Sequence, residues 1–225
     1  MSANSPVTLC VARSPALASR SQDPKSPQVR LAGIAWPDAF TLAKLTGLVQ
    51  SKNHRFLLRR EEQAGLEELR QGPTILIGAF NDNWTLRLMD TGRFTFQKDG
   101  PRLWIGDKQN PESRQWSISL DRFDADGRPI LNQDYAVISR LMHPRTGTMV
   151  ITVGGLWGFG TEAAGEFVTN PVYLEQAMAH APANWETQNL QIVVGTEVID
   201  NNIGPPRVLA TQCWQASESA SSNTR

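Results

Sequence analysis

The sequence predicts an α/β domain: a three-layer, Rossmann-like fold with a mostly parallel sheet and antiparallel edge strands. Three observations predict it. Strand-like and helix-like stretches alternate through the first half of the chain. Ile75, Leu76 and Ile77 follow one another in a run too short for a buried helix, which suits a strand covered on both faces. Alternating residues on either side of Asp99-Gly100 predict an antiparallel hairpin.

The elements of the first half follow from local patterns. Val7, Leu9 and Val11 alternate with more polar residues, which predicts a strand at 6–12. Serines and prolines dominate the next stretch and predict a flexible loop at 13–30. Asp38 is then expected to cap a helix that runs to about Gln50. A strand at 55–59, a short helix at 66–70 and the buried strand at 74–80 complete this half.

The second half is richer in strands. We expect a short helix at 85–90 and a long helix from Thr161 to about His180, which the proline of Asn170-Pro171 should interrupt because proline removes a backbone donor. Strands are expected at 93–97, 102–106, 116–120, 135–141, 149–153, 190–199 and 207–214. The polar tail 215–225 is expected to be disordered, so the chain reads as a single domain over 1–214.

Charge and composition exclude several classes of protein. The 225 residues include 22 Lys and Arg residues against 22 Asp and Glu residues. A neutral chain has no electrostatic basis for sequence-independent nucleic-acid binding, so no direct nucleic-acid partner is expected. No apolar run reaches the roughly 18 to 20 residues of a membrane helix, and no secretory signal is recognisable. We therefore expect a soluble chain without a membrane segment, cytoplasmic by default.

A glycine-rich segment from Gly154 to Thr161 joins a buried strand to a helix start. Glycines let backbone N–H groups converge on a ligand, and a helix N-terminus favours an anion. Thr161 is the natural N-cap of this helix. The alternative is a purely structural turn. The candidate ligand-binding residues are Gly155, Trp157, Gly158, Gly160, Thr161 and Glu162.

This segment also fits the spacing of a dinucleotide-binding loop, but the match is weak. Glu162 would place a negative charge where a pyrophosphate must lie, and no acidic residue follows about 20 positions on. No phosphate-loop lysine and no His/Cys metal cluster is present either. We therefore expect no cofactor and no metal.

A second candidate turn follows the strand at 74–80. Ligands bind at the carboxyl ends of parallel strands, so this turn and the glycine-rich segment would form one cleft if their strands were neighbours. The turn offers the amides of Asn81 and Asn83, the indole of Trp84 and the hydroxyl of Thr85. These groups suit the binding of a small molecule. The alternative is that the asparagines only satisfy their own backbone. The candidate residues are Asn81, Asp82, Asn83, Trp84 and Thr85.

These observations favour a non-catalytic domain that binds a small molecule, possibly an anion. An alternative is a hydrolase or transferase acting on a nucleotide or phosphorylated sugar, with Asp82, Asp134 or Glu162 as general base. That alternative lacks a nucleophile signature. A third alternative is a protein–protein assembly module, which would use the hairpin edge and the tryptophans and would make the chain a homo-oligomer.

The two candidate segments resemble an uncharacterised family of bacterial α/β domains. The resemblance rests on Ile77–Asn81 with Trp84-Thr85 and on Gly160–Phe167, and it spans most of residues 72–214. Such domains are similar to the C-terminal parts of longer regulators, in which a winged-helix module and a transmembrane segment come first. The resemblance implies a sensory role and, if the chain is anchored in that way, an extracytoplasmic location. It implies no catalytic residues.

Overall fold

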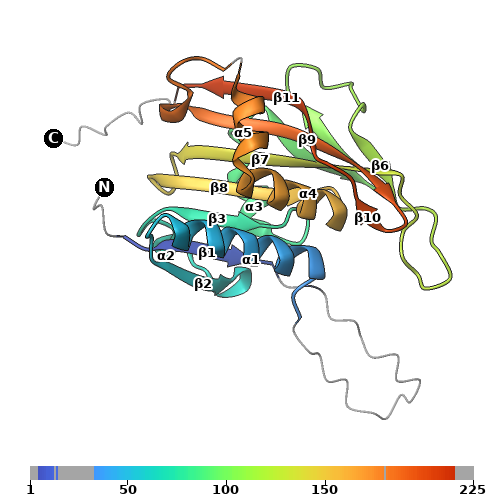
Figure 1. Cartoon of the computed structure of the whole chain (residues 1–225), viewed down its shortest axis with the longest axis horizontal. Helices are drawn as coiled ribbons and strands as arrows, with labels where there is room; N and C mark the ends of the chain where they lie inside the picture. Colours follow the sequence, from blue (N-terminus) through green and yellow to red (C-terminus); the bar gives the residue numbers. More distant parts are fainter. Residues whose placement is uncertain (1–4, 13, 15–32, 180, 216–225) are drawn as a thin grey trace, which may run out of the picture.

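The computed structural model describes residues 5–12, 14, 33–179 and 181–215. The flexible loop expected at 13–30 and the tail expected at 215–225 lie outside the described residues, except for Ser14 and Gln215. The strands form two sheets, which Figure 1 shows with the helices around them. In the large sheet the order is β10-β9-β7-β8-β3-β1-β2, and β11 also pairs with β9. Its strands are β1 (Val7–Val11), β2 (Phe56–Arg60), β3 (Thr74–Ile77), β7 (Gln133–His143), β8 (Thr148–Gly155), β9 (Asn189–Ile199), β10 (Asn202–Ile203) and β11 (Arg207–Trp214).

The expectation of a mostly parallel, Rossmann-like sheet is wrong. Strands β2, β1, β3 and β8 are parallel neighbours, but β7 is antiparallel to β8 and β9, and β9 is antiparallel to β10 and β11. The physical reason is the short connection from His143 to Thr148, which includes Gly147 at φ +68°. A parallel pair needs a crossover of a dozen or more residues, whereas a tight turn forces antiparallel pairing.

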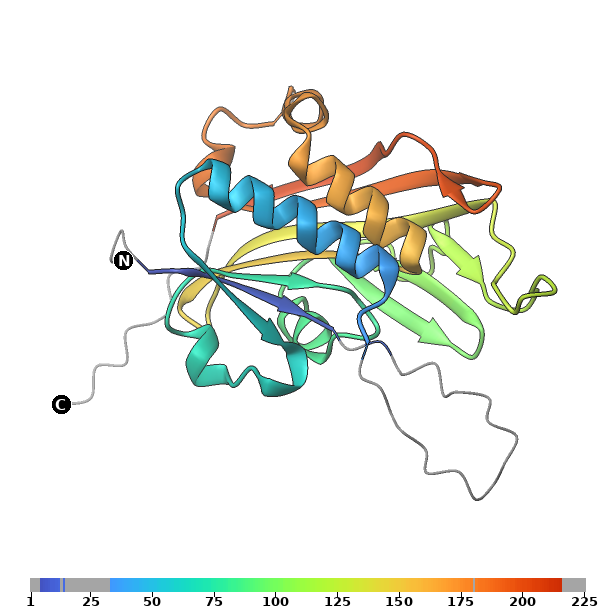
Figure 2. The ribbon, with the colours of Figure 1, turned by 60° about the horizontal axis from the view of Figure 1, so that its bottom comes forward.

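Three helices cover one face of the large sheet. They are α1 (Trp36–Ser51), α4 (Gly158–Thr169) and α5 (Pro171–Met178), and Figure 2 shows α1 and α4 running side by side. Their shared core includes Leu9, Ile75 and Phe167. Gly165 lets α1 and α4 approach closely, since a Cβ there would lie 2.5 Å from Oγ1 of Thr41.

The other face is covered by short helices and a second sheet instead of long helices. The helices are α2 (Leu66–Leu69) and α3 (Asn83–Leu88), and the sheet contains β4 (Phe94–Asp99), β5 (Arg102–Asp107) and β6 (Ser117–Ser119). Single 3₁₀ turns lie at Glu61–Gln63 and Trp185–Thr187. The large sheet therefore has long helices on one face and a second sheet with short helices on the other. The expected three-layer helix-sheet-helix arrangement is wrong on this second face.

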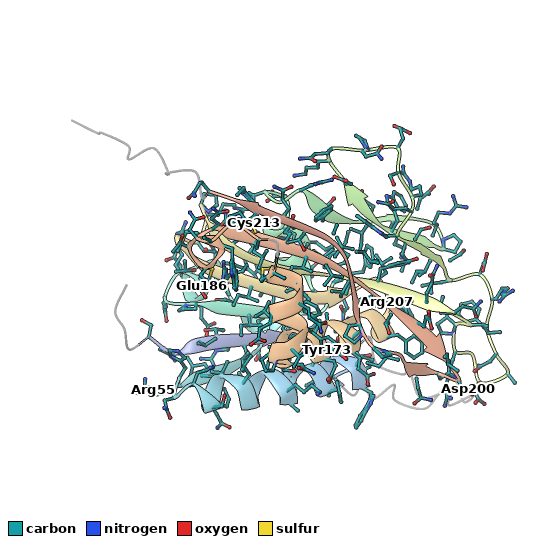
Figure 3. All side chains as sticks on the ribbon, turned by 45° about the horizontal axis from the view of Figure 1, so that its top comes forward. Arg55, Tyr173, Glu186, Asp200, Arg207 and Cys213 are labelled. Atoms are coloured by element: carbon teal, nitrogen blue, oxygen red, sulfur yellow. The ribbon has the colours of Figure 1, made fainter. Side chains whose placement is uncertain are left out.

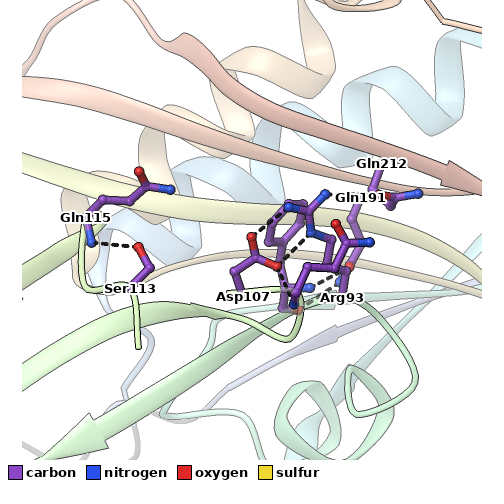
Figure 4. Close-up of polar contacts among 8 residues, drawn as sticks. Arg93, Asp107, Ser113, Gln115, Gln191 and Gln212 are labelled. Atoms are coloured by element: carbon purple, nitrogen blue, oxygen red, sulfur yellow. Dashed lines mark hydrogen bonds and ion pairs between the residues drawn. The ribbon is translucent and has the colours of Figure 1, made fainter. Parts of the chain in front are cut away.

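Buried and partly buried polar contacts fix the small sheet to the large one (Figure 4). Arg93 donates two hydrogen bonds of 2.7 Å to the carboxylate of Asp107 and one of 3.1 Å to Oε1 of Gln212 in β11. The amide side chain of Gln191 accepts from the N–H of Phe94 and donates to its carbonyl, both at 2.9 Å. These contacts hold the register between the two sheets because each buried polar atom has a defined partner.

Most elements lie where the sequence predicts them, within a few residues. The interruption at Asn170-Pro171 is confirmed: α4 ends at Thr169, and Asn170 caps α5 by accepting the N–H of Val172 at 3.1 Å. The long helix begins earlier than expected, at Gly158 instead of Thr161. The expected N-cap at Asp38 is wrong, because α1 begins at Trp36 and Asp38 lies buried inside its first turn.

Candidate functional site

The two candidate turns start next to each other. Their strands, β3 and β8, are parallel neighbours, and the N–H of Gly78 donates to the carbonyl of Val153 at 3.1 Å. A Cβ on Gly154 would lie 2.5 Å from the carbonyl oxygen of Gly78, so only glycine fits there. The chain then diverges, since α3 belongs to the face with the small sheet and α4 to the face with α1. The two turns therefore start side by side at the carboxyl ends of β3 and β8, and the chain then leads to opposite faces of the sheet.

The turn after β3 is held by its own side chains. Asn81 accepts the N–H of Ala79 at 3.1 Å and donates its amide to Oδ2 of Asp38 at 2.9 Å. Asp82 is the N-cap of α3, where Oδ1 accepts the N–H groups of Trp84 at 2.8 Å and of Thr85 at 3.0 Å. Thr85 is thus capped and does not itself cap the helix.

Asp82 of this turn and its neighbour Asp38 of α1 are both buried. Burial raises the pKa of Asp82 to about 7 and that of Asp38 to about 6, while their hydrogen bonds act in the opposite direction. Trp84 donates its indole N–H to the carbonyl of Ala64 at 3.0 Å and packs beside the core that contains Cys10. Asn83 is exposed at the start of α3. These contacts make the turn a structural junction in which Trp84 is an anchor.

The N-terminus of α4 is occupied by Asp134 from β7. Its Oδ2 accepts the N–H of Gly160 at 2.6 Å, and its Oδ1 accepts those of Tyr135 at 2.7 Å and Trp157 at 3.3 Å. Asp134 is fully buried, and this burial raises its pKa to about 7 against the lowering effect of the three N–H donors. Two of the backbone donors expected to hold an external anion, the N–H groups of Trp157 and Gly160, therefore already hold an internal carboxylate.

The glycines of this segment have a packing role. A Cβ on Gly160 would lie 2.5 Å from the carbonyl oxygen of Tyr135, and one on Gly155 would lie 2.3 Å from the backbone nitrogen of Thr161. Thr161 is not the N-cap; Trp157 occupies that position, and the hydroxyl of Thr161 accepts the N–H of Gly155 at 3.0 Å. Glycine thus lets α4 begin in contact with β7 and β8.

A pocket of about 290 Å³ lies outside this junction. The start of α1 contributes Trp36 and Pro37, and the start of α4 contributes 157–159 and Glu162. The turn from β9 to β10 and β10 itself contribute 201–203. Figure 3 shows Asp200 at this turn, at the far end of β9 from Glu186. Trp36 is 75% exposed and Trp157 is 40% exposed, which is unusual for indoles in one pocket.

Glu162 is the one ionisable side chain among the described residues that line the pocket. Partial burial raises its pKa, and the nearby ammonium of Lys44 acts in the opposite direction. Lys44 itself forms an ion pair with Glu166, one turn further along α4. The pocket therefore combines aromatic surface with a single carboxylate and contains no basic side chain among these lining residues.

Three of the predicted site residues line this pocket: Trp157, Gly158 and Glu162. Gly155, Gly160 and Thr161 lie behind them in the buried junction, and the turn at 81–85 does not line the pocket. Sequence reasoning missed the contributions of α1, of the turn from β9 to β10 and of one aromatic residue in the glycine-rich segment. The missed lining residues are Trp36, Pro37, Phe159, Asn201, Asn202 and Ile203.

Other kinds of site find no support in the described ranges. Within residues 5–12, 14, 33–179 and 181–215, no three His, Cys, Asp or Glu side chains gather as a metal site would require. No helix in the same ranges has the length and apolar character to span a bilayer. Asp82 and Asp134, two of the three candidate general bases, are completely buried and bound to backbone N–H groups.

The chain was compared with protein-family models, curated proteins and solved structures, and none of the three comparisons finds a match. The resemblance to sensory domains of bacterial regulators therefore stays a prediction. Function is inferred from the geometry of this chain.

Proposed function

We propose that this chain is a non-catalytic ligand-binding domain, of the kind found in sensory proteins, and that its small-molecule ligand occupies the pocket between α1, α4 and the turn from β9 to β10. The single observation that carries the proposal is the pair of exposed indoles, Trp36 and Trp157, in one concave surface. Small-molecule sites are concave and mostly apolar, with a few placed polar groups.

The pocket has a rigid frame, which favours a preformed site. The backbone of Trp157 is held by Asp134, and Gly158 lies so close to Pro37 that a Cβ would approach Cγ of the proline to 2.7 Å. Lys44 of α1 is paired with Glu166 of α4. A wall held by such contacts loses little conformational entropy when a ligand binds.

The same geometry argues against an anionic ligand and against the enzymatic alternative. Asp134 accepts the N–H groups of Trp157 and Gly160 at the start of α4, so these two donors are not free to bind a phosphate or carboxylate. A phosphorylated substrate also needs cationic side chains, and the described lining residues include none. Glu162 stands without a second ionisable partner among those residues, whereas acid–base catalysis of transfer commonly uses two.

A fragment screen by amide NMR tests the proposal. Fragments of mixed charge, added at millimolar concentration, should shift the indole N–H signals of Trp36 and Trp157 and the backbone amide signals of these two residues and of Phe159. The fragment-induced shifts at the backbone amide of Phe159 should disappear in the Trp36→Ala, Trp157→Ala double variant. They should remain in Phe123→Ala, which removes an aromatic ring that is 54% exposed elsewhere on the surface. A screen in which no fragment perturbs these three residues would overturn the proposal.

A further inference from the structure

The two tryptophans of the pocket, Trp36 and Trp157, differ in their partners from three of the other five tryptophans. Trp84, Trp104 and Trp185 each face a guanidinium of the chain itself, at 5.6, 4.5 and 5.2 Å from the ring. Among the described residues, no cationic side chain faces Trp36 or Trp157, although both rings are exposed. The negatively polarised face of an indole attracts a cation. Within the part of the chain that the structure describes, two such faces therefore have no internal cation against them.

The charges around the pocket favour a cation as well. Each helix N-terminus contributes about half a positive charge, so α1 and α4 together supply roughly one. Glu162 alone balances that amount when it is ionised, and the buried carboxyls of Asp38 and Asp134 lie directly at the two helix starts. Lys44 carries the ammonium that acts on Glu162, and its charge is paired with Glu166.

We propose that the pocket selects a small organic cation, namely a quaternary or protonated amine. The inference rests on the proposed function, and it is drawn from the two indoles and from this charge balance. The ammonium lies against Trp36 and Trp157, and the carboxylate of Glu162 supplies the counter-charge. A volume of about 290 Å³ is at the lower end of ligand-site sizes, which suits a head group more than a drug-sized molecule. Asn201 and Asn202, exposed at the rim, offer amides to a hydroxyl on the same ligand.

Choline and its neutral carbon isostere, in which a tert-butyl group replaces the trimethylammonium group, separate charge from shape. The carboxylate with the same tert-butyl group supplies the anionic probe. Binding of each probe is measured from the indole signals of Trp36 and Trp157 in NMR titrations of the full chain. Choline should bind roughly ten-fold more tightly than the neutral isostere, and the anion should bind least, because cation–π attraction adds to the shared apolar contact.

Two variants locate the effect. Glu162→Gln should weaken choline binding several-fold and leave the neutral isostere unchanged. Trp157→Leu should weaken both. Glu175→Gln removes an exposed carboxylate of α5 outside the pocket and should change neither affinity. Equal thermal unfolding midpoints for the variants would show that each remains folded.

The outcomes distinguish this inference from the proposed function. If the neutral isostere or the anion binds at the two indoles as tightly as choline does, the pocket is a ligand site without selectivity for cations, and the inference is wrong while the proposed function stands. If none of the three probes binds, the inference also fails, and the fragment screen alone decides the proposed function. A preference for choline that survives Glu162→Gln in full would overturn the role of that carboxylate.

Discussion

The two junctions at which a parallel strand leads into a helix look similar in sequence and differ in construction. At the end of β3, Asp82 caps α3 from within the turn itself. At the end of β8, the cap of α4 comes from Asp134 in β7, which lies more than twenty residues before the first residue of the helix. In both, a buried aspartate takes two of the backbone donors that an external anion would otherwise use. A helix start next to glycines is therefore weak evidence for an anion site.

The difference between the junctions lies in their aromatic residues. Trp84 turns inward and its indole N–H is bound to Ala64, whereas Trp157 remains 40% exposed beside Trp36. The first junction is closed, and the second has an outer surface that forms one wall of a pocket. The comparison teaches that the inner side of the second junction supports the fold and that only its outer side is open to a ligand.

The largest expected effect is the loss of the cap provided from β7. Asp134→Ala would leave three N–H groups without their acceptor in the interior, so we expect the free energy of unfolding to fall by about 3 to 5 kcal/mol. Urea unfolding followed by tryptophan fluorescence measures it. A loss below about 1 kcal/mol would mean that water or another group replaces the carboxylate and that the junction is not built around it.

The next effect tests the close approach of α4 to β7. Gly160→Ala would place a Cβ 2.5 Å from the carbonyl oxygen of Tyr135, and the resulting strain should cost about 2 kcal/mol. Gly47→Ala is the matched control, because Gly47 lies in α1 with open space around its Cβ position, and it should gain about 0.5 to 1 kcal/mol. Equal effects in the two variants would contradict the packing role.

A smaller effect is expected at the first junction. Asp82→Ala removes a local cap that supplies two hydrogen bonds, while Oδ2 of Asp82 has no hydrogen-bond partner in the described structure. We expect a loss of about 1 to 2 kcal/mol, and a smaller one in Asp82→Asn, which retains the acceptor. Urea unfolding of both variants gives the values. The comparison fails if Asp82→Ala destabilises the protein as much as Asp134→Ala.

The pH dependence of stability gives the most gradual effect. In the folded state burial raises the pKa of Asp134 from the ordinary 3.8 to about 7. The carboxyl of Asp134 then binds its proton more tightly in the folded protein than in the unfolded chain. The resulting contribution to the free energy of unfolding is fully present below about pH 4 and is lost as the pH rises through about 7. The stability of the wild type relative to Asp134→Asn should fall by about 1 kcal/mol per pH unit across that window. If the stability of the wild type relative to Asp134→Asn rises with pH instead, the raised pKa of Asp134 is contradicted.

Local patterns in the sequence predict the elements well. The alternation of Val7, Leu9 and Val11 and the interruption at Asn170-Pro171 both appear in the structure as expected. Strand direction is not predicted correctly, although one signal is present: a turn of only a few residues between His143 and Thr148 cannot connect parallel strands. The expected mostly parallel sheet fails because the alternation of strands and helices says less about strand direction than the length of this connection does.

The candidate site could be predicted only in part. Trp157 is predicted because it lies in the glycine-rich segment and Glu162 because it directly follows that segment, and both line the pocket. Trp36 and Asn201 come from distant parts of the chain, and nothing in the local pattern of either residue reports that the fold brings them together. The role of Asp134 is likewise hidden, because a cap from a neighbouring strand leaves no signature near the helix that it caps.

A phosphate titration tests the central claim most directly. Inorganic phosphate is added to the labelled chain and the backbone amide signals of Trp157 and Gly160 are followed by NMR. Because Asp134 already accepts both N–H groups, we predict that these signals stay in place at phosphate concentrations that saturate ordinary helix-terminus sites. Saturable shifts of both amides would show that an external anion reaches the start of α4, and would contradict both the capping role of Asp134 and the exclusion of anions from the pocket.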